Sequence, residues 1–212
     1  IRTNNVNTAI EQFHAYVIGR PDNGYLLKEL GDLYRRNEQY EQARDAYLQA
    51  IETGFDSAHL YRNLAISHER LDEDEQAEIH FKAALARDPD DPFTLNYLGY
   101  WWAESGRHLT QAIQLIEQAV RLRPDSGFFV DSLGWVHYQL GNYKLAVEFL
   151  EKATMLEPED AVIIAHLGDA YWQTKRYSEA HYKWRYAAQI TKDSALQAEL
   201  QNKLASGLSI AG

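Results

Sequence analysis

The sequence predicts an all-α protein built as a solenoid of stacked helix–turn–helix repeats, and three series of residues predict it. A Leu precedes a Gly or Ala at positions 31, 65, 99, 134 and 168, so the steps are 34, 34, 35 and 34 residues. Alanines follow at positions 43, 77, 112, 146 and 180, and again at positions 50, 84, 119, 153 and 187. Small residues at such intervals let paired helices approach closely. Because one helix pair cannot bury its apolar face alone, the repetition predicts a continuous core between stacked pairs.

Large side chains and prolines complete each repeat. The position between the two alanine series carries Tyr47, Phe81, Ile116, Leu150 and Trp184. Prolines close the units at positions 89, 124 and 158, and Pro21 precedes the first complete unit. A proline cannot continue a helix but is well suited to start the next one. We therefore expect the large residues to fill the space between helices, with a break at each proline.

The repeat interval divides the chain into seven segments. The expected complete units are 24–57, 58–91, 92–126, 127–160 and 161–194, preceded by 1–23 as the second helix of a partial repeat and followed by 195–212 as a capping helix with a frayed tail from Gly207. The third unit has one extra residue, expected in its internal turn near 105–110, where an insertion costs least. Leu196, Leu200 and Leu204 recur every four residues, as on the apolar face of a capping helix. We expect the chain to begin inside a longer array.

Helix starts are predicted from capping residues. Asp91 precedes Pro92, which combines a side-chain acceptor with a proline suited to the first helical position. Asp125 or Ser126 is expected to cap the helix of the fourth unit, and Asp160 that of the fifth.

Composition excludes several classes of function. The formal net charge is −10, from 21 Lys and Arg against 31 Asp and Glu, which argues against nucleic-acid binding. The absence of cysteine excludes disulfides and a thiol nucleophile. No apolar run approaches the ~20 residues of a membrane-spanning helix, so we expect no direct membrane insertion by this fragment. A periplasmic or outer-membrane-associated location and a cytoplasmic one are both compatible with the sequence, so the compartment stays open.

No catalytic pattern is present in the sequence. Phosphate-binding loops, dinucleotide-binding glycines, a nucleophile elbow and the HExxH zinc pattern are all missing. We therefore predict a protein that is not an enzyme and has no catalytic, cofactor or metal site. His166 and Asp169 stand three residues apart on one predicted helix and are expected to be able to pair.

The repeat resembles the tetratricopeptide repeat (TPR). The resemblance rests on Leu-Gly, an aromatic three residues later (Tyr34, Trp102, Tyr171, with His68 and His137 in the other units), the alanines and the closing proline. It implies a right-handed superhelical solenoid whose first helices line a concave groove. The phrases NYLGYWWAESG and VDSLGWVHYQLGNY also resemble the C-terminal repeats of long bacterial TPR scaffold and adaptor proteins.

The resemblance also implies which residues face the groove. The partner-binding residues expected from it are Lys28, Arg35, Arg62, Asn63, Phe93, Asn96, Tyr97, Tyr100, Phe128, Asp131, Trp135, Tyr138, His166, Asp169 and Trp172. The first third of this set is basic and the rest is aromatic, a combination suited to an acidic segment or a C-terminal carboxylate. Trp101 and Trp102 are expected in the core instead.

Three functions remain open at this stage. The leading hypothesis is a non-catalytic protein–protein interaction scaffold or adaptor that binds a peptide segment or a folded partner in the concave groove. One alternative is an accessory domain of a larger, possibly enzymatic, protein. The other is self-association through terminal repeats, whose exposed apolar ends can stack on each other.

Overall fold

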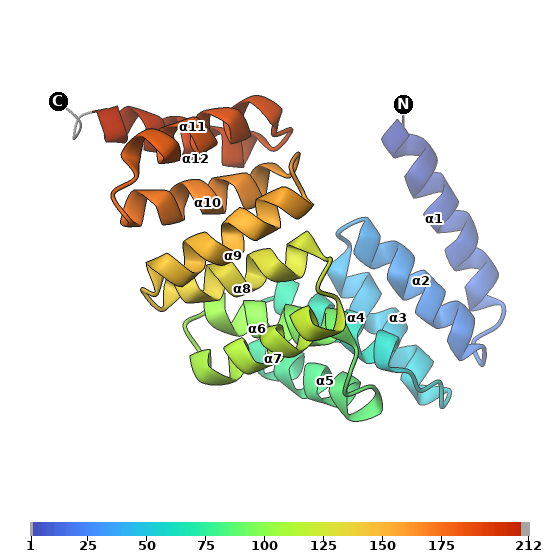
Figure 1. Ribbon diagram of the computed structural model, residues 1–212. Coiled ribbons are helices and arrows are strands. Elements are labelled where there is room, and N and C mark those ends of the chain that lie inside the picture. The colour runs from blue at the N-terminus through green and yellow to red at the C-terminus, as the bar shows by residue number, and fades with distance from the viewer. Residues whose placement is uncertain (1, 209–212) are drawn as a thin grey trace. The chain divides into compact units, whose positions relative to one another are not determined.

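The computed structural model describes residues 2–208, and this part of the chain consists of helices and the turns between them, without a strand. The helices are α1 (Arg2–Ile18), α2 (Gly24–Arg36), α3 (Tyr40–Glu52), α4 (Ala58–Arg70), α5 (Asp74–Arg87), α6 (Pro92–Glu104), α7 (Leu109–Leu122), α8 (Gly127–Gln139), α9 (Tyr143–Leu156), α10 (Ala161–Gln173), α11 (Tyr177–Ile190) and α12 (Ser194–Leu208) (Figure 1). The predicted all-α helical-repeat solenoid is confirmed. None of the described helices is long and apolar enough to cross a membrane.

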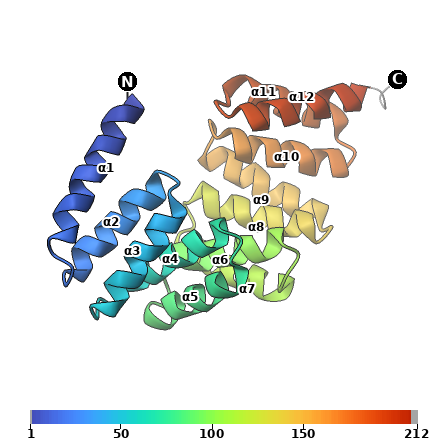
Figure 2. The same ribbon diagram turned by 180° about the vertical axis from the view of Figure 1, so that it is seen from behind.

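The chain forms two compact units, and each is described by itself. Unit 1 runs to Thr94 and unit 2 starts at Leu95, so the boundary falls inside α6. In unit 1 the helices pack in sequence order, from α1 against α2 to α4 against α5. In unit 2 the same order holds from α7 to α12, and α8 also contacts α10 (Figure 2).

The small residues lie where helices meet, as predicted. All ten repeat alanines are fully buried, as are Tyr47, Phe81, Ile116 and Leu150 between them. The repeat glycines are closely approached. A Cβ on Gly134 would lie 2.7 Å from Cγ of Leu150, and one on Gly168 would lie 2.5 Å from the indole of Trp184. Helix pairs at this separation leave no room for a side chain at these positions.

The turn inside each helix pair contains a residue in the left-handed backbone conformation, at an equivalent position in each pair. The residues concerned are Glu38 (φ 60°), Asp72 (φ 59°), Gly106 (φ 66°), Gly141 (φ 76°) and Lys175 (φ 64°). The α6–α7 connection covers residues 105–108, whereas the α4–α5 connection covers 71–73. His108 in the longer connection also has a positive φ of 48°. The division into repeat units at 24, 58, 92, 127 and 161 stays our interpretation of this helix pattern.

The predicted caps differ in how they act. Asp160 accepts hydrogen bonds from the backbone N–H groups of Val162 and Ile163 at 2.9 and 3.0 Å, and Asp91 accepts one from Thr94 at 3.1 Å. These two caps are confirmed. Ser126 stands at the N-cap of α8, but its side chain makes no capping hydrogen bond.

The two ends of the described chain pack onto their neighbours. The buried side chains of Ile10 and Val17 join α1 to the core of unit 1. At the other end Leu200 is fully buried, and Leu196 and Leu204 pack against the same core of unit 2. The predicted apolar stripe of α12 is therefore confirmed. This helix includes Gly207, and the rest of the expected frayed tail, residues 209–212, lies outside the described residues.

Candidate functional site

The residues expected to face a partner differ widely in exposure. Phe93 and Phe128 are each 53% exposed. Asn63, Asp131 and Asp169 are buried. The remaining ten are half-buried, namely Lys28, Arg35, Arg62, Asn96, Tyr97, Tyr100, Trp135, Tyr138, His166 and Trp172. Asn63 and Asp131 are not available as an open contact surface, which corrects that part of the expectation, whereas Asp169 still lines a pocket.

In unit 1 the buried carboxylate of Asp32 gathers the predicted polar residues around itself. Lys28 donates to it at 2.7 Å, the Tyr47 hydroxyl at 2.7 Å and the Asn63 amide at 2.8 Å. Burial raises the pKa of Asp32, but these donors outweigh it and hold the pKa below its usual value. Arg35 lies beside the Tyr47 hydroxyl. Lys28 and Asn63 therefore satisfy an internal carboxylate.

Arg62, another predicted partner-binding cation of unit 1, is also paired with a carboxylate. Arg62 donates to Asp91 at 2.6 Å, and its guanidinium carbon lies 5.7 Å from the centre of the Phe93 ring. Burial raises the pKa of Asp91, yet the Thr94 and Arg62 hydrogen bonds lower it overall. Lys28 and Arg62 were expected to be open to a partner and are instead neutralised by carboxylates of their own unit.

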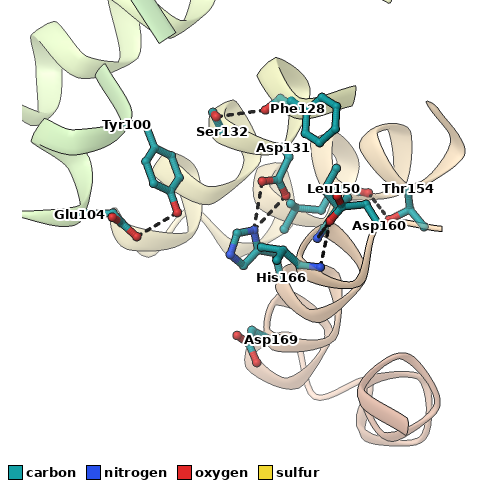
Figure 3. A network of polar contacts seen from close by, with 12 residues as sticks. Tyr100, Glu104, Phe128, Asp131, Ser132, Leu150, Thr154, Asp160, His166 and Asp169 are labelled. Carbon is teal, nitrogen blue, oxygen red and sulfur yellow. Dashed lines mark hydrogen bonds and ion pairs between the residues drawn. The ribbon is translucent and has the colours of Figure 1, made fainter. Parts of the chain in front are cut away.

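In unit 2 the predicted residues of α8 and α10 come together. His166 Nδ1 lies 2.9 Å from Oδ1 and 3.1 Å from Oδ2 of Asp131 (Figure 3). The ring of Trp135 stacks on His166, with centroids 4.0 Å apart, and on Tyr138, with centroids 4.7 Å apart. These contacts form a continuous aromatic stack, which we call the α8–α10 stack, made of His166, Trp135 and Tyr138.

The Asp131 carboxylate and the Tyr100 ring border the α8–α10 stack. Burial lowers the pKa of His166, but the Asp131 carboxylate raises it more, so the net pKa is raised and the protonated ring is favoured. On α6 the Tyr100 hydroxyl donates to Glu104 at 2.9 Å, and Figure 3 shows its ring on the side of Asp131 that faces α6. Asn96 and Tyr97 lie half-buried on the same helix.

Asp169 has partners different from the one expected. Its carboxylate accepts hydrogen bonds from Trp184 Nε1 at 2.9 Å and from Lys203 Nζ at 2.8 Å. The predicted pairing of His166 with Asp169 is therefore wrong, because each side chain binds a partner on another helix. A helical spacing of three residues permits a pair, but a better donor or acceptor from a packed neighbour prevails.

A pocket of about 310 Å³ opens beside the stack. It is lined by Tyr138, Asp169, Trp172, Gln173, Trp184, Lys203 and Ser206. Gln173 also donates to the Tyr138 hydroxyl at 3.3 Å. The wall thus combines three aromatic rings with an ion pair and an amide. Among described residues, no group of three or more His, Asp and Glu is placed to hold a metal ion.

Lys203 and Trp184 were not singled out as site residues from the sequence. Lys203 lies on α12, which was assigned only a capping role, and Trp184 occupies a core position of the repeat. A sequence signal for both exists. Lys203 follows Asp169 by 34 residues, one repeat length, and Trp184 follows it by 15.

Comparison with known proteins agrees with this architecture. Two family models described as tetratricopeptide repeat match the chain, one at residues 1–58 and 28–92 and the other at residues 137–181. The TPR repeat-containing protein PA4667 of Pseudomonas aeruginosa is 29% identical over 117 residues, covering 55% of this chain and 20% of the relative. The chain therefore spans about a fifth of the length of that relative.

Solved structures share the fold. A chain of the APC/C hetero-tetramer Cut9–Hcn1 superposes with a TM-score of 0.81 at 20% identity, covering 97% of this chain and 40% of that one. Pseudomonas aeruginosa PilF superposes with a TM-score of 0.72 at 24% identity, covering 89% of this chain and 90% of PilF. At these identities the likeness shows the fold alone. Together with the matched family models, the helix pairs, buried alanines and closely packed glycines show that the chain belongs to the tetratricopeptide repeat family.

Proposed function

We propose that this chain is a non-catalytic protein-interaction module that holds a peptide segment or a partner's surface against the α8–α10 stack and the adjoining pocket. The observation that carries the proposal is the stack itself. Trp135 lies between His166 and Tyr138, and Tyr138 also lines the pocket of about 310 Å³. Aromatic side chains supply large contact area and are enriched among the residues that dominate binding energy.

The stack is preorganised for binding. Asp131 holds His166, which in turn holds the face of Trp135, so little side-chain freedom remains to be lost when a partner binds. Phe128 adds an exposed ring on the same helix, α8. Gln173 supplies a hydrogen-bond donor at the pocket wall, which suits a backbone carbonyl of the bound segment.

The fold relatives support an interaction role. Cut9 is described as part of a hetero-tetramer with Hcn1, so a chain of this fold engages a second protein there. A scaffold or adaptor role for the present chain follows by analogy of fold, and the residues that carry it come from its own α8 and α10.

A capture experiment tests the proposal. The parent chain and the variant Trp135→Ala/Tyr138→Ala are used as bait in lysate of the source organism. The matched control is Leu145→Ala/Met155→Ala, which removes two exposed apolar side chains from α9 of the same unit. Thermal melts establish that all three are folded. We expect a partner that the parent and the control retain and the stack variant loses.

The remaining outcomes separate the alternatives. Equal capture by all three proteins places the binding surface elsewhere and rejects the stack. Capture of nothing by the parent, combined with a mass that rises with concentration, favours a self-association domain. Capture of nothing by a monomeric parent favours an accessory segment of a larger protein.

A further inference from the structure

The outward face of α11 carries an unusual stripe of side chains. Tyr182, Arg185, Tyr186 and Gln189 recur at the spacing of one helix face. Tyr182 is 66% exposed and Tyr186 37%, and Arg185 is also exposed. Ala180, Trp184 and Ala187 lie on the opposite face and are buried against neighbouring helices. The stripe therefore points into solvent.

The charge of this segment is opposite to that of the chain. Residues 175–192 contain five cations, Lys175, Arg176, Lys183, Arg185 and Lys192, and one acid, Glu179, within a protein of net charge −10. Arg176 is engaged by Glu151 and Glu179. Across residues 2–208 no carboxylate pairs with Lys183, Arg185 or Lys192. Lys183 and Arg185, the two cations of α11, are thus left without an internal counter-charge.

The repeat fold does not require this stripe. One repeat earlier, on α9, the positions of Tyr182 and Arg185 are held by Glu148 and Glu151. On α3 they are held by Asp45 and Leu48. Those helices bury the same small residues as α11 without an aromatic residue at either tyrosine position, since Lys152 and Gln49 stand where α11 has Tyr186, so packing does not account for the two tyrosines.

We propose that the outward face of α11 binds an acidic segment of a protein partner. Arg185 on the stripe and the half-buried Lys183 at its edge pair with carboxylates of that segment, and the rings of Tyr182 and Tyr186 cover its apolar part while their hydroxyls donate hydrogen bonds. An amphipathic membrane-binding face would carry Leu, Phe or Trp along the stripe, and this one carries none. This surface lies on a helix that does not contribute Trp135 or Tyr138, so the proposal goes beyond the function proposed for the α8–α10 stack.

The probe is an array of fluorescein-labelled peptides of about 12 residues, each rich in Asp and Glu with Leu at varied positions. The proteins compared are the parent, Lys183→Glu/Arg185→Glu on α11, and Lys144→Glu/Lys152→Glu on α9. The α9 variant has the same change in net charge at two exposed lysines, so it controls for long-range electrostatics. Fluorescence polarisation gives the dissociation constants, and thermal melts establish folding.

We expect some peptides of the array to bind the parent. Their dissociation constants for the α9 control should lie within about twofold of the parent value, and those for the α11 charge variant should be at least about tenfold higher. Tyr182→Ala/Tyr186→Ala, which keeps every charge, is expected to weaken the same peptides about three- to tenfold. Raising the salt from about 0.1 M to about 0.5 M is expected to weaken binding.

Several results would overturn the proposal. The proposal fails if no acidic peptide binds the parent more tightly than a lysine-rich control peptide does. It also fails if both charge variants weaken peptide binding equally. Binding of phosphatidylserine vesicles by the parent, lost in the α11 variant and with no peptide bound, would replace the partner with a lipid surface. A parent mass that rises with concentration and falls in the α11 variant, again with no peptide bound, would replace it with a second copy of the chain.

Discussion

The carboxylate of Asp169 accepts a hydrogen bond from Trp184 Nε1 at 2.9 Å, and the two residues are 15 positions apart. The same relationship joins Asp32 to the Tyr47 hydroxyl at 2.7 Å, again 15 positions apart. In the three other helix–turn–helix repeats the corresponding pairs are Ile66 with Phe81, Tyr100 with Ile116, and Trp135 with Leu150. At this repeat position a buried aspartate thus occurs in the two repeats whose second helix supplies a donor, as the cost of burying an unsatisfied carboxylate requires.

Removing the donor should destabilise unit 1. Tyr47→Phe leaves the buried Asp32 carboxylate with one donor fewer and is expected to lower the free energy of unfolding by about 1–3 kcal/mol. Urea unfolding followed by circular dichroism measures the change. The control is Tyr182→Phe, whose hydroxyl is exposed on α11 and should change stability by less than about 0.5 kcal/mol. Equal stability of both variants would contradict the role of this hydrogen bond.

A methyl group at Gly168 should separate two helices. Its Cβ would lie 2.5 Å from both Cδ1 and Nε1 of Trp184, and a rigid indole cannot bend away. Gly168→Ala is expected to cost about 1–3 kcal/mol through overpacking. A Cβ on Gly19 would meet only a backbone oxygen at 3.6 Å, so Gly19→Ala serves as the control and should be near neutral. Denaturant melts in which both variants matched the parent would speak against the close helix approach.

Core and surface leucines on α9 should behave differently. Leu150 is fully buried, so Leu150→Ala is expected to lower the free energy of unfolding by about 2–5 kcal/mol. Leu145 on the same helix is 42% exposed, and Leu145→Ala is expected to cost less than about 1 kcal/mol. Urea melts of the two variants check the assigned helix register, and a larger effect at Leu145 would refute it.

Relieving a strained turn should stabilise the protein. Lys175 has a φ of 64°, a conformation that costs a residue with a Cβ about 1–2 kcal/mol but is open to glycine. After the greater chain entropy of glycine is subtracted, Lys175→Gly is expected to gain about 0.5–1 kcal/mol. At the equivalent turn Gly141→Ala should lose about 1 kcal/mol, because its φ is 76°. Chemical denaturation distinguishes the two signs, and a destabilised Lys175→Gly variant would contradict the strain.

The pKa values of two histidines of unit 2 should lie on opposite sides of the ordinary histidine pKa. Burial lowers the pKa of His166 but Asp131 raises it more, so the pKa lies above 6.5. For His137 burial dominates over the attraction of Glu117, so the pKa lies below 6.5. Side-chain NMR titration measures both values, and the reverse order would contradict the Asp131–His166 pair.

The same pair makes stability depend on pH. Because the folded pKa of His166 is raised, the stabilisation from Asp131 is fully present below the unfolded pKa of about 6.5 and is lost as pH rises through the folded pKa. The stability difference between the parent and Asp131→Asn should therefore shrink from about pH 5.5 to about pH 8.5. Urea melts across this range test it, and a difference that grew with pH would have the wrong sign.

The helical framework could be predicted because its determinants repeat along the chain. Ala43 and its equivalents recur beside Tyr47 and its equivalents at a fixed interval, and each is buried as that interval implies. The buried leucines of α12 followed from a spacing of four residues in the same way.

The candidate site was less predictable because its contacts join residues far apart in sequence. Arg62 and Asp91 are separated by 29 positions, and Asp131 and His166 by 35. Family positions assign a side chain to a helix face, but they do not say which opposite charge the next helix brings to it. This is why Arg62 was expected to be open and is paired instead, whereas Lys28 pairs with Asp32 four residues along the same helix, a spacing that is visible in the sequence.

Site-specific photocrosslinking shows directly whether a partner contacts the α8–α10 stack. A benzoylphenylalanine replaces Tyr138, one of the rings of the α8–α10 stack, and in a second protein Met155, which is 76% exposed on α9. Both are irradiated in lysate of the source organism, and the adducts are identified by mass spectrometry. The proposal predicts one protein crosslinked from position 138, absent from position 155, and lost when Trp135→Ala is added. The same adduct from both positions, or one that survives Trp135→Ala, would contradict binding at the stack.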